Sequence, residues 1–435
     1  MKIPKSPPEL KDILIKKGDE LLKIMEDKEI RKYVSDCNRD YVHWDKLRRK
    51  NIPKNIDPEI LWAMIKFSRQ TKQLIRIGDV VLTYMLTDEI FKKLHMLDKG
   101  SAGRLESVFE FVNREGKDRY VISSLMEEAI ASSQLEGANT TRRLAKEMLR
   151  KNKKPSNYSE KMIVNGYRTM QNILKMKDLK LTPEIILDIQ KNITMDTLKN
   201  KNDEGKFRDN NEIVVGDSID AGKIFHTPPD YKKLQFLIEE FCKFANNDTD
   251  EFIHPIIKGI ILHFLIGYIH PFNDGNGRTA RSIFYWYVLS KGYWLFEYMA
   301  VSKILLRSRT DYGLSYLYTE TDENDLTYFI NYNLNAVEEA LHDTENYIAR
   351  KQREQAEVLK IIKTLKISNT RQADMLKEFT KEPDKIFFIK EIMTTYGVVY
   401  QTARSDLLYL SKKNYIDKIK IGKRFGFKIK NTNLF

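Results

Sequence analysis

The chain has 435 residues, 42% hydrophobic and 11% aromatic, with a net charge of +13. This length suits two or three domains, and the apolar content excludes a globally disordered protein. Only two cysteines, Cys37 and Cys242, are present, which excludes a disulfide framework and a cysteine-based zinc site and favours a cytoplasmic location. The basic balance favours acidic partners such as nucleic acid, nucleotide phosphates or acidic proteins.

No segment of the sequence suggests contact with a membrane. The start, MKIPKSPPELKDILIKK, lacks the apolar stretch of a secretory signal. The most apolar segment, Phe252–Phe272, is too short and too polar for a membrane span, so we expect a buried helix there.

The first part of the chain, residues 1–105, is predicted to be an N-terminal helical region. From residue 8 to residue 100 the pattern is helical, as in LKDILIKKGDELLKIM, where apolar residues recur every three or four positions. Asp57 followed by Pro58 predicts the start of another helix. The stretch LDKGSAGR predicts a loop at the end of the region.

Residues 106–350 are predicted to form a helical core with one β-hairpin. A helix over about 121–137 is expected to end near Gly137, a residue suited to a left-handed C-cap. Further helices are expected in YSEKMIVNGYRTMQNILKM and PEIILDIQKNITMD, and over 256–269, 279–291 and 327–350. Between them, NEIVVGDSIDAGKIFHTPP has short β-branched runs around a Gly- and Asp-containing turn, which predicts a hairpin over about 210–228.

Residues 355–435 are predicted to form a winged helix. The expected order is a helix, a turn at Gly397, a second helix and two short strands around Gly422. Basic residues gather there, at Lys412, Lys413, Lys418, Lys420, Lys423, Arg424, Lys428 and Lys430. Such a module either binds DNA through phosphate contacts or binds proteins or its own chain.

The segment HPFNDGNGRTAR, residues 270–281, concentrates groups that suit a nucleotide. Pro271 is expected to stop a buried helix, and a new helix is expected to start near Arg278. Gly275 and Gly277, on either side of Asn276, let the chain approach a ligand closely. The free N–H groups at the start of the second helix would bind phosphate. The segment is not a Walker A loop, because no GxxxxGK[ST] string occurs.

The side chains of this segment complete the prediction. Arg278 and Arg281 are three residues apart and share one helix face, where they can grip phosphate oxygens. Asp274 offers a hard oxygen for Mg²⁺. His270 has an ordinary pKa near neutrality and can take a proton from an attacking hydroxyl. The segment therefore predicts a Mg-nucleotide site with a general base beside it.

HPFNDGNGRTAR resembles the HPFx[D/E]GNGRxxR signature of Fic-domain proteins, and the resemblance covers roughly residues 120–345, including the spacing of His254 and His263. It implies transfer of AMP from ATP to a hydroxyl of a target protein. His270 would act as the base and Asp274 would hold Mg²⁺. The Gly275–Gly277 stretch, with Asn276, would hold the α- and β-phosphates, and Arg278 and Arg281 the β- and γ-phosphates. The related Doc-type kinases have altered glycines in this loop, so intact Gly275 and Gly277 favour AMP transfer.

The resemblance implies two further elements. The hairpin of 210–228, preceded by GKFRDN, looks like the flap that pairs with the target segment as an added strand. RTDY, Arg309 to Tyr312, resembles the segment that places an aromatic ring in the nucleotide pocket, which assigns Tyr312 to the adenine or ribose. A later position, often Asn in relatives, is Glu320 here, and this leaves the contacts to the base open.

SSQLEG, Ser132 to Gly137, resembles the [S/T]xxxE[G/N] inhibitory motif found with Fic domains, in the subclass that places it before the core. A Glu136 carboxylate beside Arg281 would occupy the position of the γ-phosphate and repel it. In some relatives the same glutamate supports removal of AMP, so de-AMPylation is an alternative activity.

These predictions combine into one fold class and two functions. We expect a mainly α protein: a Fic-like helical core with a β-hairpin flap, an N-terminal helical region and a C-terminal winged helix. The first function is a protein adenylyltransferase held inactive by Glu136. The alternative is a DNA-binding regulator with a nucleotide-sensing or self-modifying core. The target, the modified residue type, self-modification and assembly as a homodimer stay open.

Overall fold

The computed structural model describes all residues except 54–55, 71, 101–113, 217–221, 248–251, 366, 368, 423 and 431–435. For residues 114–120, 351–352 and 354–363 it describes the backbone alone. The chain divides into two compact units, one with residues 1–149 and 154–341 and the other with residues 150–153 and 342–435. The domain boundary predicted at 105–106 lies outside the described residues, and the division into three domains stays a prediction.

The first hundred residues form helices and one hairpin that the sequence analysis did not predict. The helices are α1 (Leu10–Ile24), α2 (Lys28–Arg39), α3 (Trp44–Leu47), α4 (Pro58–Ser68) and α5 (Asp88–Lys99). Asp57 caps α4 as predicted, because its side chain accepts a hydrogen bond from the N–H of Glu59. The expectation of helices alone is wrong at β1 (Gln73–Ile77) and β2 (Val80–Tyr84), which pair antiparallel across a two-residue turn. Gly78 has φ +60° in that turn, a backbone angle that glycine adopts without strain.

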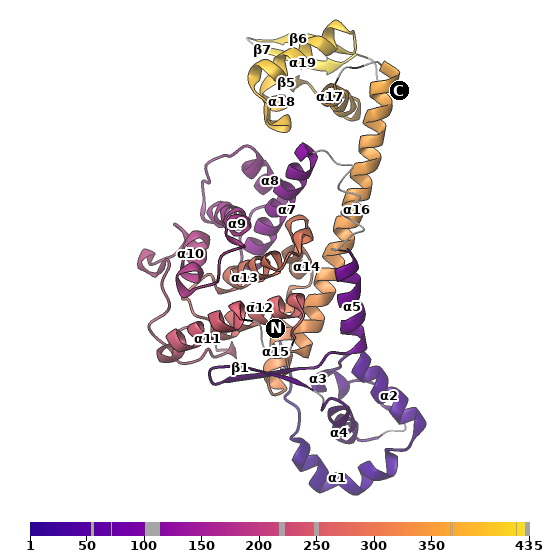
Figure 1. Cartoon of the computed structure of the whole chain (residues 1–435), viewed down its shortest axis with the longest axis vertical. Coiled ribbons are helices and arrows are strands. Elements are labelled where there is room, and N and C mark those ends of the chain that lie inside the picture. Colours follow the sequence, from indigo (N-terminus) through magenta and orange to yellow (C-terminus); the bar gives the residue numbers. More distant parts are fainter. Residues whose placement is uncertain are drawn as a thin grey trace. The chain divides into compact units, whose positions relative to one another are not determined.

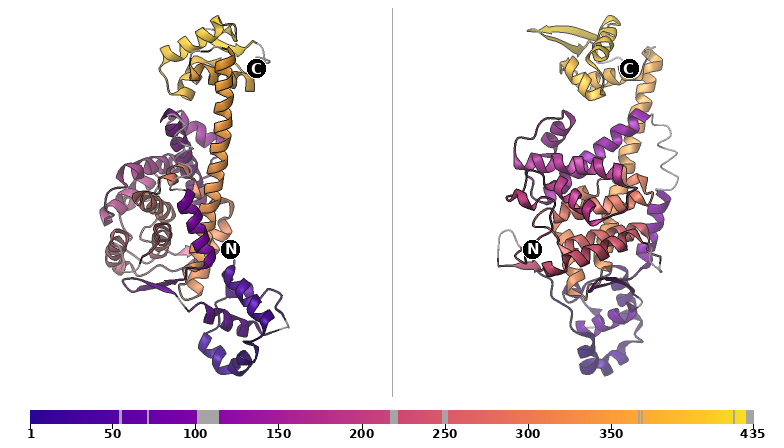
Figure 2. Two further views of the ribbon diagram at one scale, coloured as in Figure 1. Left: turned by 45° about the vertical axis from the view of Figure 1, so that its right-hand side comes forward. Right: turned by 60° about the vertical axis from the view of Figure 1, so that its left-hand side comes forward.

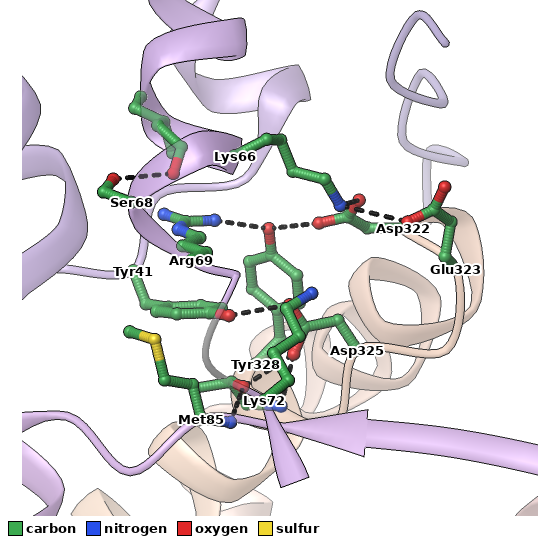
Figure 3. Close-up of polar contacts among 12 residues, drawn as sticks. Tyr41, Lys66, Ser68, Arg69, Lys72, Met85, Asp322, Glu323, Asp325 and Tyr328 are labelled. Carbon is green, nitrogen blue, oxygen red and sulfur yellow. Dashed lines mark hydrogen bonds and ion pairs between the residues drawn. The ribbon is translucent and has the colours of Figure 1, made fainter. Parts of the chain in front are cut away.

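A buried polar cluster joins this region to the loop before α16, as Figure 3 shows. Arg69 is 1% exposed; it stacks on Tyr41 and donates to the hydroxyl of Tyr328 at 3.0 Å. Tyr328 in turn donates to Asp322 at 2.8 Å, and Lys66 pairs with the same carboxylate at 2.8 Å. The hydroxyl of Tyr328 thus links the Arg69 cation to the Asp322 carboxylate, and these hydrogen bonds offset the cost of burying the two charges.

The core around residues 270–281 is helical. Figures 1 and 2 show α12 and α13 packed side by side at its centre, with α7, α9, α10 and α11 against them. The elements are α7 (Arg114–Leu135), α8 (Arg142–Arg150), α9 (Tyr158–Met176), α10 (Pro183–Thr194), α11 (Leu234–Asn246), α12 (Pro255–Ile269), α13 (Asn276–Ser290), α14 (Val301–Arg307), α15 (Arg309–Thr321) and α16 (Thr327–Leu365), with short 3₁₀ turns at Lys201–Asp203, Tyr231–Lys233 and Trp294–Tyr298. Every core helix named in the sequence analysis is present.

The hairpin predicted over 210–228 is confirmed, and we call it the flap hairpin. Its strands β3 (Val215–Gly216) and β4 (Ile224–His226) pair antiparallel, and the turn between them lies outside the described residues. Two large apolar side chains of the hairpin are exposed, Val214 at 40% and Ile224 at 46%.

The C-terminal unit has its own apolar core, in which Phe379, Leu407 and Phe427 are buried. After α17 (Thr370–Lys381) come β5 (Phe387–Phe388), α18 (Ile389–Tyr396), α19 (Tyr400–Lys412), β6 (Ile416–Ile421) and β7 (Arg424–Ile429). The strands form one antiparallel sheet in the order β5-β7-β6. The helix–turn–helix and hairpin have the predicted order; α17 and β5 were not predicted. The assignment to the winged-helix class stays a prediction.

Candidate active site

His270 stands where the buried helix α12 ends. Its backbone is left-handed, with φ 49° and ψ 59°, which is uncommon for a residue other than glycine and ends the helix before Pro271. Its Nδ1 lies 3.1 Å from the carbonyl oxygen of Gly267. Because a carbonyl only accepts, Nδ1 carries the proton and Nε2 keeps its lone pair. Burial lowers the pKa of His270 to about 4, so the ring is neutral at pH 7.

The loop after His270 is shaped by the side chain of Asn276. Its Oδ1 accepts from the N–H of Phe272 at 3.0 Å, and its Nδ2 donates to the carbonyl of Phe272 at 2.7 Å. Phe272 is fully buried. The 4% exposed Asn276 side chain therefore braces the loop, a role that was not predicted beside its expected contact with the phosphates.

Gly275 and Gly277 allow close approach at the start of α13. Gly275 has φ +89°, and a Cβ there would lie 2.8 Å from a methyl of Thr194. In the part of the chain that the structure describes, no side chain caps the first turn of α13, so its N–H groups and positive dipole end face the loop. A Cβ on Gly277 would collide with Glu136 Oε1, which shows that an acidic oxygen rests on this backbone. This arrangement can bind an anion.

Asp274 is the acidic side chain of the loop. Its Oδ1 accepts from the N–H of Gly275 at 2.5 Å and from Arg278 at 3.4 Å, and its side chain is 47% exposed. Among the described residues, no group of three or more His, Cys, Asp or Glu side chains is placed to hold a metal ion. A cation at Asp274 would therefore need oxygens from a phosphate ligand or from water, as Mg²⁺ bound with a nucleotide commonly has.

The two arginines of the loop are both 3% exposed but have different partners. Arg278 donates from Nη1 to the carbonyl of Ile193 on α10 at 3.1 Å, and its Nε is buried without a hydrogen bond among the described residues. Arg281 instead faces α7. It donates from Nε to Ser132 Oγ at 2.9 Å and from Nη2 to the Ser132 carbonyl at 2.9 Å.

The ion pair predicted between Glu136 and Arg281 is present. Arg281 Nη2 lies 3.0 Å from Glu136 Oε1, just beyond the end of α7. Gly137 follows with φ +92°, the left-handed C-terminal residue that the sequence predicted. The Glu136 side chain is 36% exposed, and its partial loss of solvent favours a raised pKa, but the charges of Arg281 and Arg278 outweigh this and hold the pKa below its ordinary value. Glu136 is therefore ionised at neutral pH.

Tyr312 lies on α15 beside His263 of α12. Its hydroxyl is 2.7 Å from His263 Nε2, and burial lowers the pKa of His263 to about 3, so this histidine is neutral. The ring of Tyr312 packs edge-on against Tyr316, with centroids 5.5 Å apart. The structure thus places Tyr312 in an aromatic cluster, and its contact with a nucleotide stays a prediction.

Three residues that hold the site together were not predicted from the sequence: Arg208, His226 and Glu128. Arg208, in the GKFRDN stretch, is 3% exposed and donates from Nε to the carbonyl of His270 at 3.0 Å. Its backbone N–H donates to Pro271 at 2.9 Å, so the residues before the flap hairpin are fixed to the loop. His226 of β4 lies 2.6 Å from Glu320 and 2.7 Å from the Tyr268 carbonyl. Glu320 therefore holds the flap hairpin.

The third is Glu128, eight residues before Glu136 on α7. This 2% exposed carboxylate accepts from the hydroxyl of Tyr285 at 2.8 Å and from the N–H of Ser302 at 2.9 Å. Burial raises its pKa. Glu128 fastens α7 to α13 and α14, and so positions Ser132 and Glu136. In the sequence it looked like one more polar residue of a helix.

None of the described helices combines the length and the apolar character needed to cross a membrane.

The part of the chain that contains the loop of residues 270–281 is similar to known proteins. Residues 180–288, which include the loop, match the Fic/DOC family. Over 89 residues the chain is 33% identical to Protein adenylyltransferase Fic of Drosophila yakuba, covering 20% of this chain and 16% of that protein. The Drosophila virilis protein of the same name is 28% identical over 120 residues, covering 27% and 22%. The chain thus aligns with only about a fifth of these relatives' length.

Two solved structures share the fold. A Fic family protein from Desulfovibrio desulfuricans G20 superposes with a TM-score of 0.50 at 16% identity, over 80% of this chain and 98% of that one. A fragment of Fic-1 from C. elegans superposes with a TM-score of 0.51 at 13% identity, over 78% and 91%. At these identities the likeness concerns the fold alone.

Proposed function

The chain carries a domain of the Fic/DOC family, and from this premise we propose that it transfers AMP from ATP to a hydroxyl side chain of a target protein. One observation carries the proposal. A neutral histidine, whose Nε2 has no partner among the described residues, lies in one loop with the start of a helix that no described side chain caps and with two buried arginines. The relatives named adenylyltransferases agree with this choice.

His270 supplies the base. Its Nε2 accepts the proton of the target hydroxyl while the oxygen forms a bond to the α-phosphorus of ATP and pyrophosphate leaves. The carbonyl of Gly267 holds the ring in the tautomer that this step needs. Arg208 holds the carbonyl of His270 and so keeps the left-handed backbone in place.

The loop fits the phosphates of ATP. Gly275 and Gly277 leave the backbone N–H groups of α13 open to the α- and β-phosphates, and the unsatisfied Nε of Arg278 is a donor for the next phosphate. Arg281 becomes a γ-phosphate ligand once it leaves Glu136. Asp274 would hold Mg²⁺, whose charge would neutralise the phosphate oxygens.

Glu136 is proposed to inhibit the resting protein. Its carboxylate lies against the backbone of Gly277 and pairs with Arg281. It therefore fills the space that a γ-phosphate needs and engages the arginine that would bind this phosphate. Ser132 holds the same arginine through two further hydrogen bonds. Movement of α7 away from α13 would free Arg281 to bind the γ-phosphate.

The flap hairpin is proposed to bind the target. An extended peptide can add to its edge through main-chain hydrogen bonds, and the exposed Val214 and Ile224 offer apolar contacts for its side chains. Through His226 the hairpin is tied to Glu320 and to Tyr268, two residues before His270. A peptide held there is therefore near the base.

The proposal is tested with Glu136→Gly protein, Mg²⁺ and ATP labelled at the α-phosphate. Label is expected on the protein itself or on proteins of a lysate. Asp274→Ala in the same background is the matched control, since it removes the proposed metal ligand and leaves His270 in place. Labelling that is equal in the two proteins would refute the proposed site.

The pH dependence of transfer provides a separate prediction. A base works only when neutral, so activity that depends on His270 is present above its folded pKa, about 4, and is lost as the pH falls through it. Removal of Glu136 takes away a charge that raises this pKa, so the direction holds in Glu136→Gly protein. Initial rates are expected to stay level from about pH 7.5 to about pH 5.5. An ordinary histidine would lose half its activity near pH 6.5, and that result would contradict the burial argument.

A further inference from the structure

The C-terminal unit has a charge distribution that the proposed transfer does not use. Residues 386–435 contain ten Lys and Arg residues but only three acidic ones, Glu391, Asp406 and Asp417. Asp406 is buried and pairs with Arg371 at 2.6 Å, and Glu391 pairs with Lys385 at 2.9 Å. Two of the three acids are thus neutralised by residues from before 386, and the exposed surface is strongly positive.

Helix α19 presents one polar face and one buried face. Ala403, Leu407 and Leu410 are fully buried in the core of the unit. The exposed residues of the helix include Gln401, Arg404, Ser405 and Lys412. Arg404 and Ser405 follow Gln401 by three and four residues, and Lys412 follows Ser405 by seven, so these side chains lie on one side of the helix. α18 precedes α19 across a turn in which Gly397 has φ +63°. This is the geometry in which a second helix of a pair projects from its module.

Two large apolar side chains are exposed at the start of α19. Val399 is 69% exposed and Tyr400 is 53% exposed, although the core of the unit lies close by. Next to Gln401 and Arg404, they form a tip that mixes apolar, amide and cationic groups. Glutamine and arginine pair with adenine and guanine edges in the major groove, and apolar groups contact the methyl of thymine.

The hairpin β6–β7 adds cations beside α19, which packs on β6. Lys418 and Lys420 are two residues apart on one strand and so share a face, and Arg424 starts the returning strand. All three are exposed. Lys418 lies 3.9 Å over the ring of Phe425, which orders its side chain. Figure 2 shows this hairpin projecting from the helices of its unit.

We propose that this surface binds double-stranded DNA, with α19 in the major groove and the β6–β7 hairpin on the phosphate backbone. α19 has 13 residues, and the diameter of an α-helix with its side chains, about 10–12 Å, matches the width of the major groove, about 12 Å. Single strands are bound through rows of stacking aromatic rings, whereas here cations outnumber exposed aromatic rings. The inference does not depend on the proposed AMP transfer.

The test uses the full chain and a fluorescent 30-bp duplex of mixed sequence, followed by anisotropy in low and moderate salt. The parent is expected to bind at low salt, with log K falling by about 0.9 per log unit of salt for each phosphate neutralised. The variant Lys418→Ala/Lys420→Ala/Arg424→Ala is expected to weaken binding at least about tenfold and to flatten the salt slope. Arg404→Ala is expected to weaken binding separately.

The control is Lys11→Ala/Lys92→Ala/Lys243→Ala, which removes the same charge from exposed positions of the other unit. It is expected to bind like the parent. Circular dichroism shows whether each variant is folded. The proposal is overturned if the parent does not bind duplex at low salt, or if the control loses as much affinity as the hairpin variant. It is also overturned if single strands or anionic vesicles bind as tightly as duplex.

Discussion

Replacing His270 with alanine in Glu136→Gly protein is expected to lower AMP transfer by about 10²–10⁴-fold, the usual loss when a general base is removed. The ring is neutral, its Nδ1 is occupied by the carbonyl of Gly267, and its Nε2 has no hydrogen-bond partner among the described residues. Nucleotide binding should be largely retained, because His270 acts on the hydroxyl and the phosphates meet the first turn of α13. Initial rates of labelling and a separate nucleotide titration measure the two effects.

A matched control distinguishes the loss of the proposed base from the effect of replacing any histidine. His342, 62% exposed in the C-terminal unit, is replaced with alanine in the same background, and transfer is expected to stay unchanged. If His270→Ala transfers AMP as fast as its parent, another group removes the proton and the proposed mechanism is wrong. If it loses nucleotide binding as well, His270 has a structural role in the loop.

The Glu136–Arg281 pair provides the second large effect. Glu136→Gly is expected to raise transfer about tenfold or more, since a hydrogen bond between charged groups commonly contributes about 1.5–3 kcal/mol and this carboxylate is partly exposed. Glu136→Gln, which removes the charge and keeps most of the volume, should fall between the two. The order of the three rates separates charge from occupied space.

Arg281→Ala should not imitate this release. It removes the partner of Glu136 and the γ-phosphate ligand together, so the single variant and the double variant with Glu136→Gly should both be inactive. Full activity in the double variant would show that Arg281 serves only the inhibitory contact.

The sequence predicted the parts of the site that depend on local chemistry. The end of α12 at His270, the glycine at φ +89° and the uncapped start of α13 follow from residue types within a few positions. The pairing of Glu136 with Arg281 joins positions 145 residues apart and was predicted through the resemblance. Local sequence pattern was sufficient for the loop, and motif resemblance was sufficient for the ion pair.

The missed features depend on contacts between distant segments. Arg208 and Glu128 gain their roles from carbonyls, hydroxyls and N–H groups that only the folded core brings near them. The bond from Arg278 to the carbonyl of Ile193 is of the same kind. The β1–β2 hairpin does have a local signal, the alternating pattern around Gly78 and Asp79, so this hairpin was predictable from the sequence. Its strands are fixed partly by Thr83, which bonds to Asn324 and Leu326.

The central claim is that the chain transfers AMP and not phosphate. The most direct measurement gives Glu136→Gly protein two samples of ATP with Mg²⁺, one labelled at the α-phosphate and one at the γ-phosphate, and counts protein-bound label in each. We expect label from the α-position and none from the γ-position, with His270→Ala giving background in both. Label that reaches protein only from the γ-position would contradict the account and place the chain with enzymes that transfer phosphate.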